Sequence, residues 1–158
     1  MKVDKLHIRS RFKNLEDVKV DFDEHHLMTI VVGRNGSGKS NVLEALVAIF
    51  RNLDLGEAPP FSYELNYQLG EENWVKWYEI KVDADPNRGT LAKQYQISVR
   101  DKHSSETSFK SIPFSKVKRD KKTKQAEYLP NFLFAYYSGP SDRLEKYFRR
   151  HRDEYYRE

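Results

Sequence analysis

The chain has 158 residues, which is enough for one ordinary domain or for one lobe of a larger one. Hydrophobic residues make up 38% of it and charged residues 33%, against about 45–50% and about 25% in an average globular domain. No stretch reaches the roughly 18 uninterrupted apolar residues of a membrane helix, the first residues lack the apolar segment of a secretory signal, and the absence of cysteine excludes disulfides, thiolate catalysis and zinc ribbons. We therefore expect a cytoplasmic protein with no membrane partner, whose nine Phe, ten Tyr and two Trp can build a packed core.

The net charge of +4 is unevenly distributed. Residues 1–90 carry 12 basic and 15 acidic side chains, whereas residues 91–158 carry 16 basic and 9 acidic ones. The basic excess lies in two clusters: Lys116, Lys118, Arg119, Lys121, Lys122 and Lys124, and then Arg143, Lys146, Arg149, Arg150, Arg152 and Arg157. Such clusters can bind a polyanion such as DNA, because neutralised phosphates release counterions. We favour the alternative, a solvated loop followed by a solvated helix face, since no aromatic residue interleaves the first cluster.

Two strands, a buried strand and a helix are predicted in the first third of the chain. Alternating apolar and polar residues predict strands at 2–8 and 18–22, joined by a turn at 11–15. The continuous apolar run at 27–32 ends in glycine and is typical of a strand buried on both faces. Apolar residues at helical spacing then predict a helix over 39–53, which Gly56 and a pair of prolines close.

The remainder of the chain predicts an antiparallel insert, a loop and a return to the core. Alternating segments at 61–69, 74–84 and 91–99 are separated by turn sequences, which predicts a meander of hairpins at about 61–100. Residues 101–131 are expected to form a basic loop with a short strand near 109–112. The apolar run 132–137 predicts a second buried strand, and Ser141 can N-cap a helix from Asp142 to the end. The predicted class is α/β, with the core elements of 1–60 and 132–158 split by the antiparallel β insert.

One motif in the sequence indicates a chemical function. The run Gly33-Arg34-Asn35-Gly36-Ser37-Gly38-Lys39-Ser40 fits the pattern G-x-x-x-x-G-K-[ST] at every specified position. Gly36 and Gly38 permit backbone dihedrals that other residues avoid, so that successive N–H groups can form an anion nest at the start of the following helix. In such a loop Lys39 contacts the β- and γ-phosphates and the Ser40 hydroxyl is a ligand of Mg²⁺. The sequence therefore predicts a P-loop NTPase lobe that binds ATP and Mg²⁺; the alternative is an ordinary glycine-rich turn that binds nothing.

The order of the segments resembles a particular group of ATPases. Leu6-x-Ile8, Phe12–Leu15, Val18-x-Val20-x-Phe22, the glycine-rich loop and the continuation Asn41-Val42-Leu43-Glu44-Ala45-Leu46 are similar to the N-terminal lobe of the ABC-type ATPases of the SMC, RecF and OLD group. The resemblance is specific over residues 1–50 and rests on architecture alone over 51–140. The segment Tyr136–Ser141 is similar to one found in bacterial AAA-family members of this group, many of which are implicated in phage defence.

This resemblance implies further site residues. In these ATPases the first hairpin packs beside the adenine and ribose, which would place Arg11, Lys13 and Asn14 near the nucleotide; the alternative is that they are exposed turn residues. Asn41 continues the nucleotide-binding loop. The family also has a glutamine after the insert that contacts Mg²⁺, but Ser138-Gly139 stands at that place here, and Gln94 and Gln96 lie on a predicted strand.

Other family motifs are missing from the sequence. Hydrolysis requires an apolar strand that ends in Asp, followed by a Glu that activates water. The segments ending in Asp21 and Asp83 alternate with polar residues and do not qualify, and no signature motif of the L-S-G-G-Q type is present. We therefore interpret the chain as the N-terminal portion of a longer ATPase, one that binds ATP·Mg²⁺ weakly and does not hydrolyse it alone.

The resemblance also implies partners. In the family, ATP binds between two ATPase heads of a homodimer or higher oligomer, and head engagement acts on DNA or on an attached nuclease or effector subunit. Two other interpretations remain open: a non-catalytic P-loop module for dimerisation or for regulating a partner effector, and a nucleic-acid-binding domain that acts through the basic half.

Overall fold

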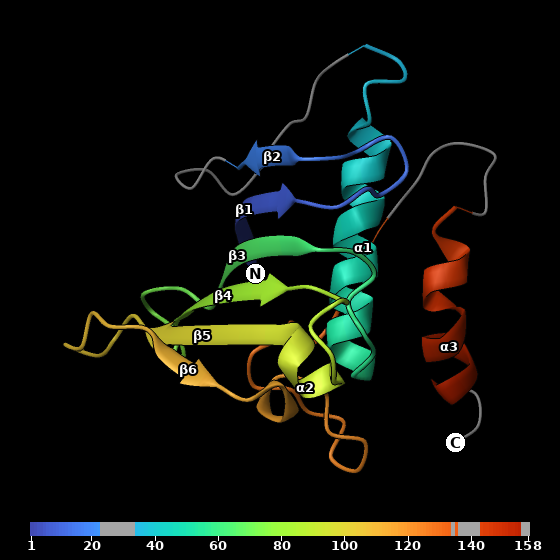
Figure 1. Ribbon diagram of the computed structural model, residues 1–158. Helices are drawn as coiled ribbons and strands as arrows, with labels where there is room; N and C mark the ends of the chain where they lie inside the picture. The colour runs from blue at the N-terminus through green and yellow to red at the C-terminus, as the bar shows by residue number, and fades with distance from the viewer. Residues whose placement is uncertain (23–33, 134, 136–142, 156–158) are drawn as a thin grey trace.

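A computed structural model describes residues 1–22, 34–133, 135 and 143–155 of the chain. Its elements are β1 (Lys2–Ile8), β2 (Val18–Asp21), α1 (Lys39–Leu55), β3 (Tyr63–Leu69), β4 (Tyr78–Ala84), α2 (Leu91–Gln94), β5 (Tyr95–Asp101), β6 (Lys110–Ile112), the 3-10 turn η1 (Phe114–Lys116) and α3 (Glu145–Tyr155). Figure 1 shows α1 lying across the sheet and α3 beside α1, away from the strands. Within the described part, no helix combines the length and the apolar character that crossing a bilayer would require.

The strands form a single antiparallel sheet in the order β2-β1-β3-β4-β5-β6. β1 lies in its interior, with Leu6 opposite Val20 of β2 on one side and Leu65 of β3 on the other. Among the described residues, the strands of the predicted insert therefore extend the sheet of the first hairpin. Alternation of apolar residues decides which face of a strand is buried but not which strand it pairs with, so the β1–β3 pairing could not be predicted.

Helix α1 covers the buried face of this sheet. It runs for 17 residues, two more than predicted, and ends where Gly56 adopts a left-handed conformation (φ 70°) and donates its N–H to the Asn52 carbonyl. Phe50 packs edge-on against Tyr67 of β3, with ring centroids 5.3 Å apart. Apolar residues of α1 and of β1, β3, β4 and β5 thus share one core.

Two tyrosines of β3, Tyr63 at its start and Tyr67, are fully buried but differ in their hydrogen bonding. The Tyr67 hydroxyl donates to the Tyr128 carbonyl at 2.6 Å, whereas the Tyr63 hydroxyl has no hydrogen-bond partner among the described residues. Burial raises the pKa of both phenols, so neither ionises in the physiological range. The Tyr95 side chain is the polar neighbour of the Tyr63 hydroxyl but does not reach hydrogen-bond geometry, so the cost of desolvating this hydroxyl is only partly recovered.

An ion-pair cluster ties the end of β1 to the end of β4. Arg9 donates to the Asp83 carboxylate at 2.6 Å and to the Ala84 carbonyl at 2.8 Å, and Arg88 donates to the same carboxylate at 2.8 Å. Partial burial raises the pKa of Asp83, but the hydrogen bonds from the two arginines outweigh it, so the pKa lies below its usual value.

The insert differs from prediction at two strand starts. The segment predicted as a strand from Trp74 becomes one only at Tyr78, because a turn precedes it: the Trp74 amide donates to the Glu71 carbonyl at 2.9 Å, and Val75 is 96% exposed. The strand predicted from Leu91 begins with the single helical turn α2, and β5 starts at Tyr95. In both places an apolar pattern continued into a turn whose residues are exposed.

The basic loop is more ordered than expected. It contains the predicted short strand, β6, and it is anchored by Phe114 and the fully buried Val117. Arg119 binds the Asp54 carboxylate of α1 at 2.7 Å. The five lysines of the first basic cluster are exposed, as expected of a solvated surface: Lys116, Lys118, Lys121, Lys122 and Lys124.

The C-terminal part is described only in pieces. Of the predicted strand 132–137, residues 132, 133 and 135 are described; they lie outside any strand, and Phe132 is 78% exposed, so these residues do not form the buried strand that was predicted. The predicted C-terminal helix is present as α3. The predicted buried strand 27–32 and the predicted N-cap Ser141 lie outside the described residues.

Candidate functional site

The glycine-rich loop bends as the motif requires. Gly36 and Gly38 have positive φ values of 85° and 98°, a conformation that side-chain-bearing residues rarely adopt. The Ser37 amide donates to the Arg34 carbonyl at 3.1 Å, and the Gly38 carbonyl accepts from the amides of the first helical turn at 2.9 and 3.0 Å. The loop therefore passes directly into the N-terminus of α1, where unpaired N–H groups favour an anion. Gly33 lies outside the described residues.

Lys39 folds back over this loop. Its ammonium group donates to the Arg34 carbonyl at 2.8 Å. This hydrogen bond joins the two ends of the described part of the loop. The amide N–H groups of Gly38 and Ser40 have no hydrogen-bond acceptor among the described residues. Ser40 lies half-buried in the first turn of α1, whereas Asn35 and Ser37 are exposed. A lysine ammonium and backbone N–H donors at a helix start are the groups that bind phosphate.

The turn between β1 and β2 touches the loop through Asn14. The Asn14 side-chain amide donates to the Gly36 carbonyl at 3.2 Å, and its oxygen accepts a hydrogen bond from the Asn41 side chain. The neighbouring Leu15 is buried, and a Cβ placed on Gly38 would lie 2.7 Å from its Cδ2 atom. Two of the predicted site residues, Asn14 and Asn41, are thus brought together at the loop, and a side chain at Gly38 would not fit without displacing Leu15.

The other two predicted turn residues lie differently. Arg11 is exposed, and its guanidinium donates to the Lys13 carbonyl at 3.2 Å without contacting the described loop residues. Lys13 has a positive φ of 55°, and its ammonium forms an ion pair with Glu44 of α1. Lys13 is therefore held beside the helix that follows the loop and not at the loop itself.

Glu44 was not predicted as a site residue, yet it is the most buried charged group near the loop. Its side chain is 1% exposed and binds Lys13, Arg143 at 3.3 Å, Lys146 at 3.3 Å and the Tyr147 hydroxyl at 3.0 Å. Burial raises the pKa of Glu44, but the hydrogen bonds from Lys13, Tyr147 and Lys146 outweigh it and lower the pKa below its usual value. The only signal in the sequence was a carboxylate within an otherwise apolar helix face.

The comparison with protein families agrees with the sequence resemblance. The family model described as the AAA ATPase domain matches residues 1–151. The chain belongs to this family. The match confirms the expected likeness to the N-terminal lobe of an AAA-family ATPase of the SMC, RecF and OLD type. No curated protein and no solved structure matches the chain.

The residues of this AAA ATPase domain fit the phosphate end of a nucleotide. Asn14 holds the Gly36 carbonyl by a hydrogen bond, the free amides of Gly38 and Ser40 are donors, and Lys39 supplies a positive charge. The fit to a divalent cation is limited to the Ser40 hydroxyl, since the described residues contain no group of three or more His, Asp or Glu side chains that could hold a metal ion. Ser40 would therefore need ligands from the nucleotide and solvent.

The carboxylates and glutamines that the sequence left as weak alternatives are engaged elsewhere in the domain. Asp21 lies 3.6 Å from Lys5, and Asp83 is bound by the two arginines at the end of β4. Gln94 donates to the carbonyls of Pro86 and Gly89 at 2.9 and 3.0 Å, which closes the hairpin loop. These contacts are structural, and none of them reaches the glycine-rich loop.

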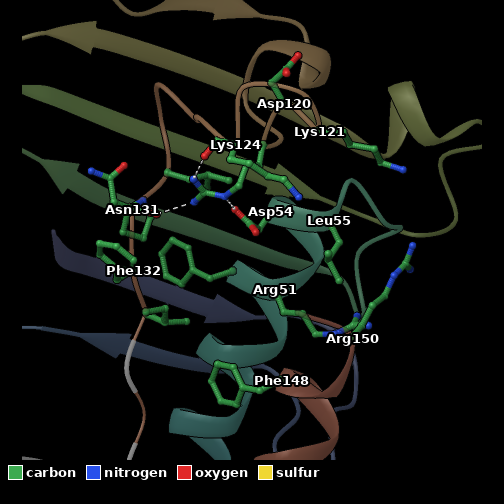
Figure 2. Close-up of a pocket in the computed structure, with 15 residues that line it drawn as sticks. Arg51, Asp54, Leu55, Asp120, Lys121, Lys124, Asn131, Phe132, Phe148 and Arg150 are labelled. Atoms are coloured by element: carbon green, nitrogen blue, oxygen red, sulfur yellow. Dashed lines mark hydrogen bonds and ion pairs between the residues drawn. The ribbon is translucent and has the colours of Figure 1, made fainter. Parts of the chain in front are cut away.

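A separate cavity of about 500 Å³ lies at the other end of α1, between that helix, the basic loop and α3. Figure 2 shows Phe132 and Phe148 on its wall, with Lys121, Lys124 and Arg150 at its edge. No local pattern in the sequence indicates this cavity, because its walls come from segments up to about a hundred residues apart. It is far along α1 from Lys39 and plays no part in the phosphate site.

Proposed function

We propose that the chain binds ATP·Mg²⁺ at residues 33–41 and acts as the N-terminal lobe of an ATP-driven, SMC/RecF/OLD-like ATPase with a P-loop NTPase fold. The observation that carries the proposal is the bend of the loop: positive φ at Gly36 and Gly38, immediately before α1, with the Lys39 ammonium folded across it. That geometry directs backbone N–H groups and a lysine ammonium to the start of a helix, where an anion is favoured.

Each residue has a defined part in the proposal. The amides of Gly38 and Ser40 donate to phosphate oxygens, and Lys39 exchanges its contact with the Arg34 carbonyl for the β- and γ-phosphates. The Ser40 hydroxyl is a ligand of Mg²⁺, which when bound neutralises phosphate charge. By the family resemblance, we propose that Asn14 and Arg11 pack beside the base and ribose. Because the sequence contains no apolar strand ending in Asp after the loop, we expect binding without turnover.

Isothermal titration of the chain with Mg·ATP tests this proposal. Replacing a charge-assisted contact costs roughly 1.5–3 kcal/mol, so Lys39→Ala should weaken binding by about 10- to 150-fold. Lys122→Ala is the matched control, because Lys122 is an exposed lysine of the basic loop. No binding by the natural chain, or equal binding by the Lys39→Ala and natural chains, would contradict a nucleotide site at this loop.

We further propose that ATP joins two copies of this head. Light scattering after size-exclusion chromatography should show a dimer that requires Mg·ATP and that Lys39→Ala abolishes. The second candidate, a non-catalytic module that dimerises or holds an effector, predicts the same oligomer with and without nucleotide. The intact Lys39 and Ser40 favour the first candidate, because a degenerate loop would have no need of them.

DNA is the substrate we propose for the complete ATPase, coupled to a nuclease or effector, and phage defence is the setting. The support for this choice is the resemblance to ATPases that act on DNA, and the five exposed lysines of the basic loop are the surface on which it is tested. Titration with duplex DNA at several salt concentrations tests it, since each phosphate neutralised contributes a slope of about −0.9 in log K against log salt. A slope near zero would contradict the assignment of DNA to this surface.

A further inference from the structure

A continuous chain of hydrogen bonds runs from the glycine-rich loop to α3. Asn14 donates to the Gly36 carbonyl at 3.2 Å, Asn41 donates to Asn14, and the guanidinium of Arg143, two residues before α3, donates to the side-chain oxygen of Asn41. Asn41 and Arg143 are 102 positions apart in the sequence. We call Asn14, Asn41 and Arg143 the relay. Each asparagine uses its side-chain nitrogen toward the loop and its side-chain oxygen toward Arg143, so moving one of them disturbs both of its neighbours.

The same guanidinium also binds Glu44, which fixes the far end of the relay. Arg143 Nη2 lies 3.3 Å from Glu44 Oε2, and Tyr147 and Lys146 of α3 bind the other carboxylate oxygen. With Lys13, three cations surround this one buried carboxylate. The cluster therefore carries a surplus of positive charge, and Glu44 lies one helical turn from Ser40, where that surplus favours a bound phosphate.

The orientation of the Gly36 carbonyl is what connects this relay to binding. A carbonyl oxygen directed at a phosphate would repel it, so the loop can accept an anion only while that carbonyl is held elsewhere. Asn14 holds it, Asn41 orients Asn14, and Arg143 orients Asn41. Docking of α3 thus stabilises the loop conformation that binds phosphate.

From these contacts we infer that Arg143 is a positioning residue that couples occupancy of the phosphate site to the docking of α3 on α1. The inference rests on the proposed nucleotide binding and extends it to regulation of the same site. By reciprocity, if docking of α3 tightens nucleotide binding, the nucleotide stabilises docking of α3 by the same factor. Docking of α3 on α1 then depends on whether a nucleotide is bound at the loop, and α3 is the element that transmits this occupancy to the remainder of the ATPase.

Binding measurements on four forms of the chain test the coupling: Arg143→Ala, Asn41→Ala, the double variant and Arg149→Ala. Arg149 is the matched control, an exposed arginine of the same helix. Arg143→Ala and Asn41→Ala should each raise the Kd for Mg·ATP within the roughly 5- to 150-fold range of coupled sites, and Arg149→Ala should not. In the Asn41→Ala background, the further effect of Arg143→Ala should fall within about twofold.

Hydrogen exchange of residues 145–155 supplies the second readout. In the natural chain, saturating Mg·ATP should slow exchange in α3 by a factor similar to the change in Kd, and Arg143→Ala should remove that response while circular dichroism shows an unchanged fold. If nucleotide binds but α3 does not respond, or if the two variants act additively, the coupling is refuted and the nucleotide site stands. If the natural chain binds no nucleotide, both the site and the coupling are refuted.

Discussion

Substituting the two glycines of the bend gives a direct measure of how tightly the β1–β2 turn packs on the loop. Both have positive φ, and placing alanine there costs about 1–2 kcal/mol of backbone strain. They differ in their surroundings: a Cβ on Gly36 meets nothing within 4 Å, whereas a Cβ on Gly38 lies 2.7 Å from the Cδ2 atom of the buried Leu15. Overpacking of this kind costs about 1–3 kcal/mol, and the lower part of that range applies because a methyl at the end of a side chain can partly rotate away.

We therefore expect Gly36→Ala to lower the free energy of unfolding by about 1–2 kcal/mol and Gly38→Ala to lower it by about 2–4 kcal/mol. Urea denaturation followed by circular dichroism measures both, and a common m-value shows that the denatured state is unchanged. Gly36→Ala serves as the strain control, so the difference between the two variants isolates the contact with Leu15. Equal losses would refute the close packing of the turn against the loop.

Three further predictions concern the sheet. Tyr63→Phe should leave the unfolding free energy unchanged or raise it by about 1 kcal/mol, because it removes a buried hydroxyl without a hydrogen bond. Tyr67→Phe should lower the unfolding free energy by about 1 kcal/mol, because it removes a buried hydrogen bond. The reverse order in urea denaturation would contradict the assigned hydrogen bonds. Because the pKa of Asp83 is lower in the folded protein than its value of about 3.9 in the unfolded chain, Asp83 contributes stability above the unfolded pKa. This contribution is lost as the pH falls through the folded pKa. Asp83→Asn should therefore make the unfolding free energy fall less steeply between about pH 5 and pH 2. Leu65→Ala, in a fully buried position, should cost about 2–5 kcal/mol, whereas the exposed Leu43→Ala should change the unfolding free energy by at most about 0.5 kcal/mol, and similar values for the two would place Leu65 outside the core.

Local patterns in the sequence were enough to predict most of the helices and strands. The strand predicted at 2–8 has the bounds of β1, and the helix predicted from Lys39 begins there and ends beside Gly56. Alternation and helical spacing report which face of an element is buried, and glycine reports where a helix stops, so such features can be read locally. The bend at Gly36 and Gly38 was predictable for the same reason.

Structural features that depend on residues distant in the sequence could not be predicted from it. The β1–β3 pairing joins residues about sixty positions apart, and the cluster at Glu44 draws on Lys13 and on α3, some thirty and one hundred positions away. A lone glutamate in an apolar helix face looks like a surface residue until its cations are placed in space. Asn14 was expected near the nucleotide through family resemblance, and its contact with the Gly36 carbonyl is a detail that only coordinates show.

The interior position of β1 also sets an order of events during synthesis. During synthesis β1 can pair along one edge with β2, which begins ten residues after β1 ends, but its other edge waits for β3, and Val3 reaches its partner only at Tyr67. Until then that edge presents unpaired backbone groups that a neighbouring nascent chain could join. A product of translation that stops before β3 is thus open to association with other chains, and pairing with β3 is what covers this edge of β1.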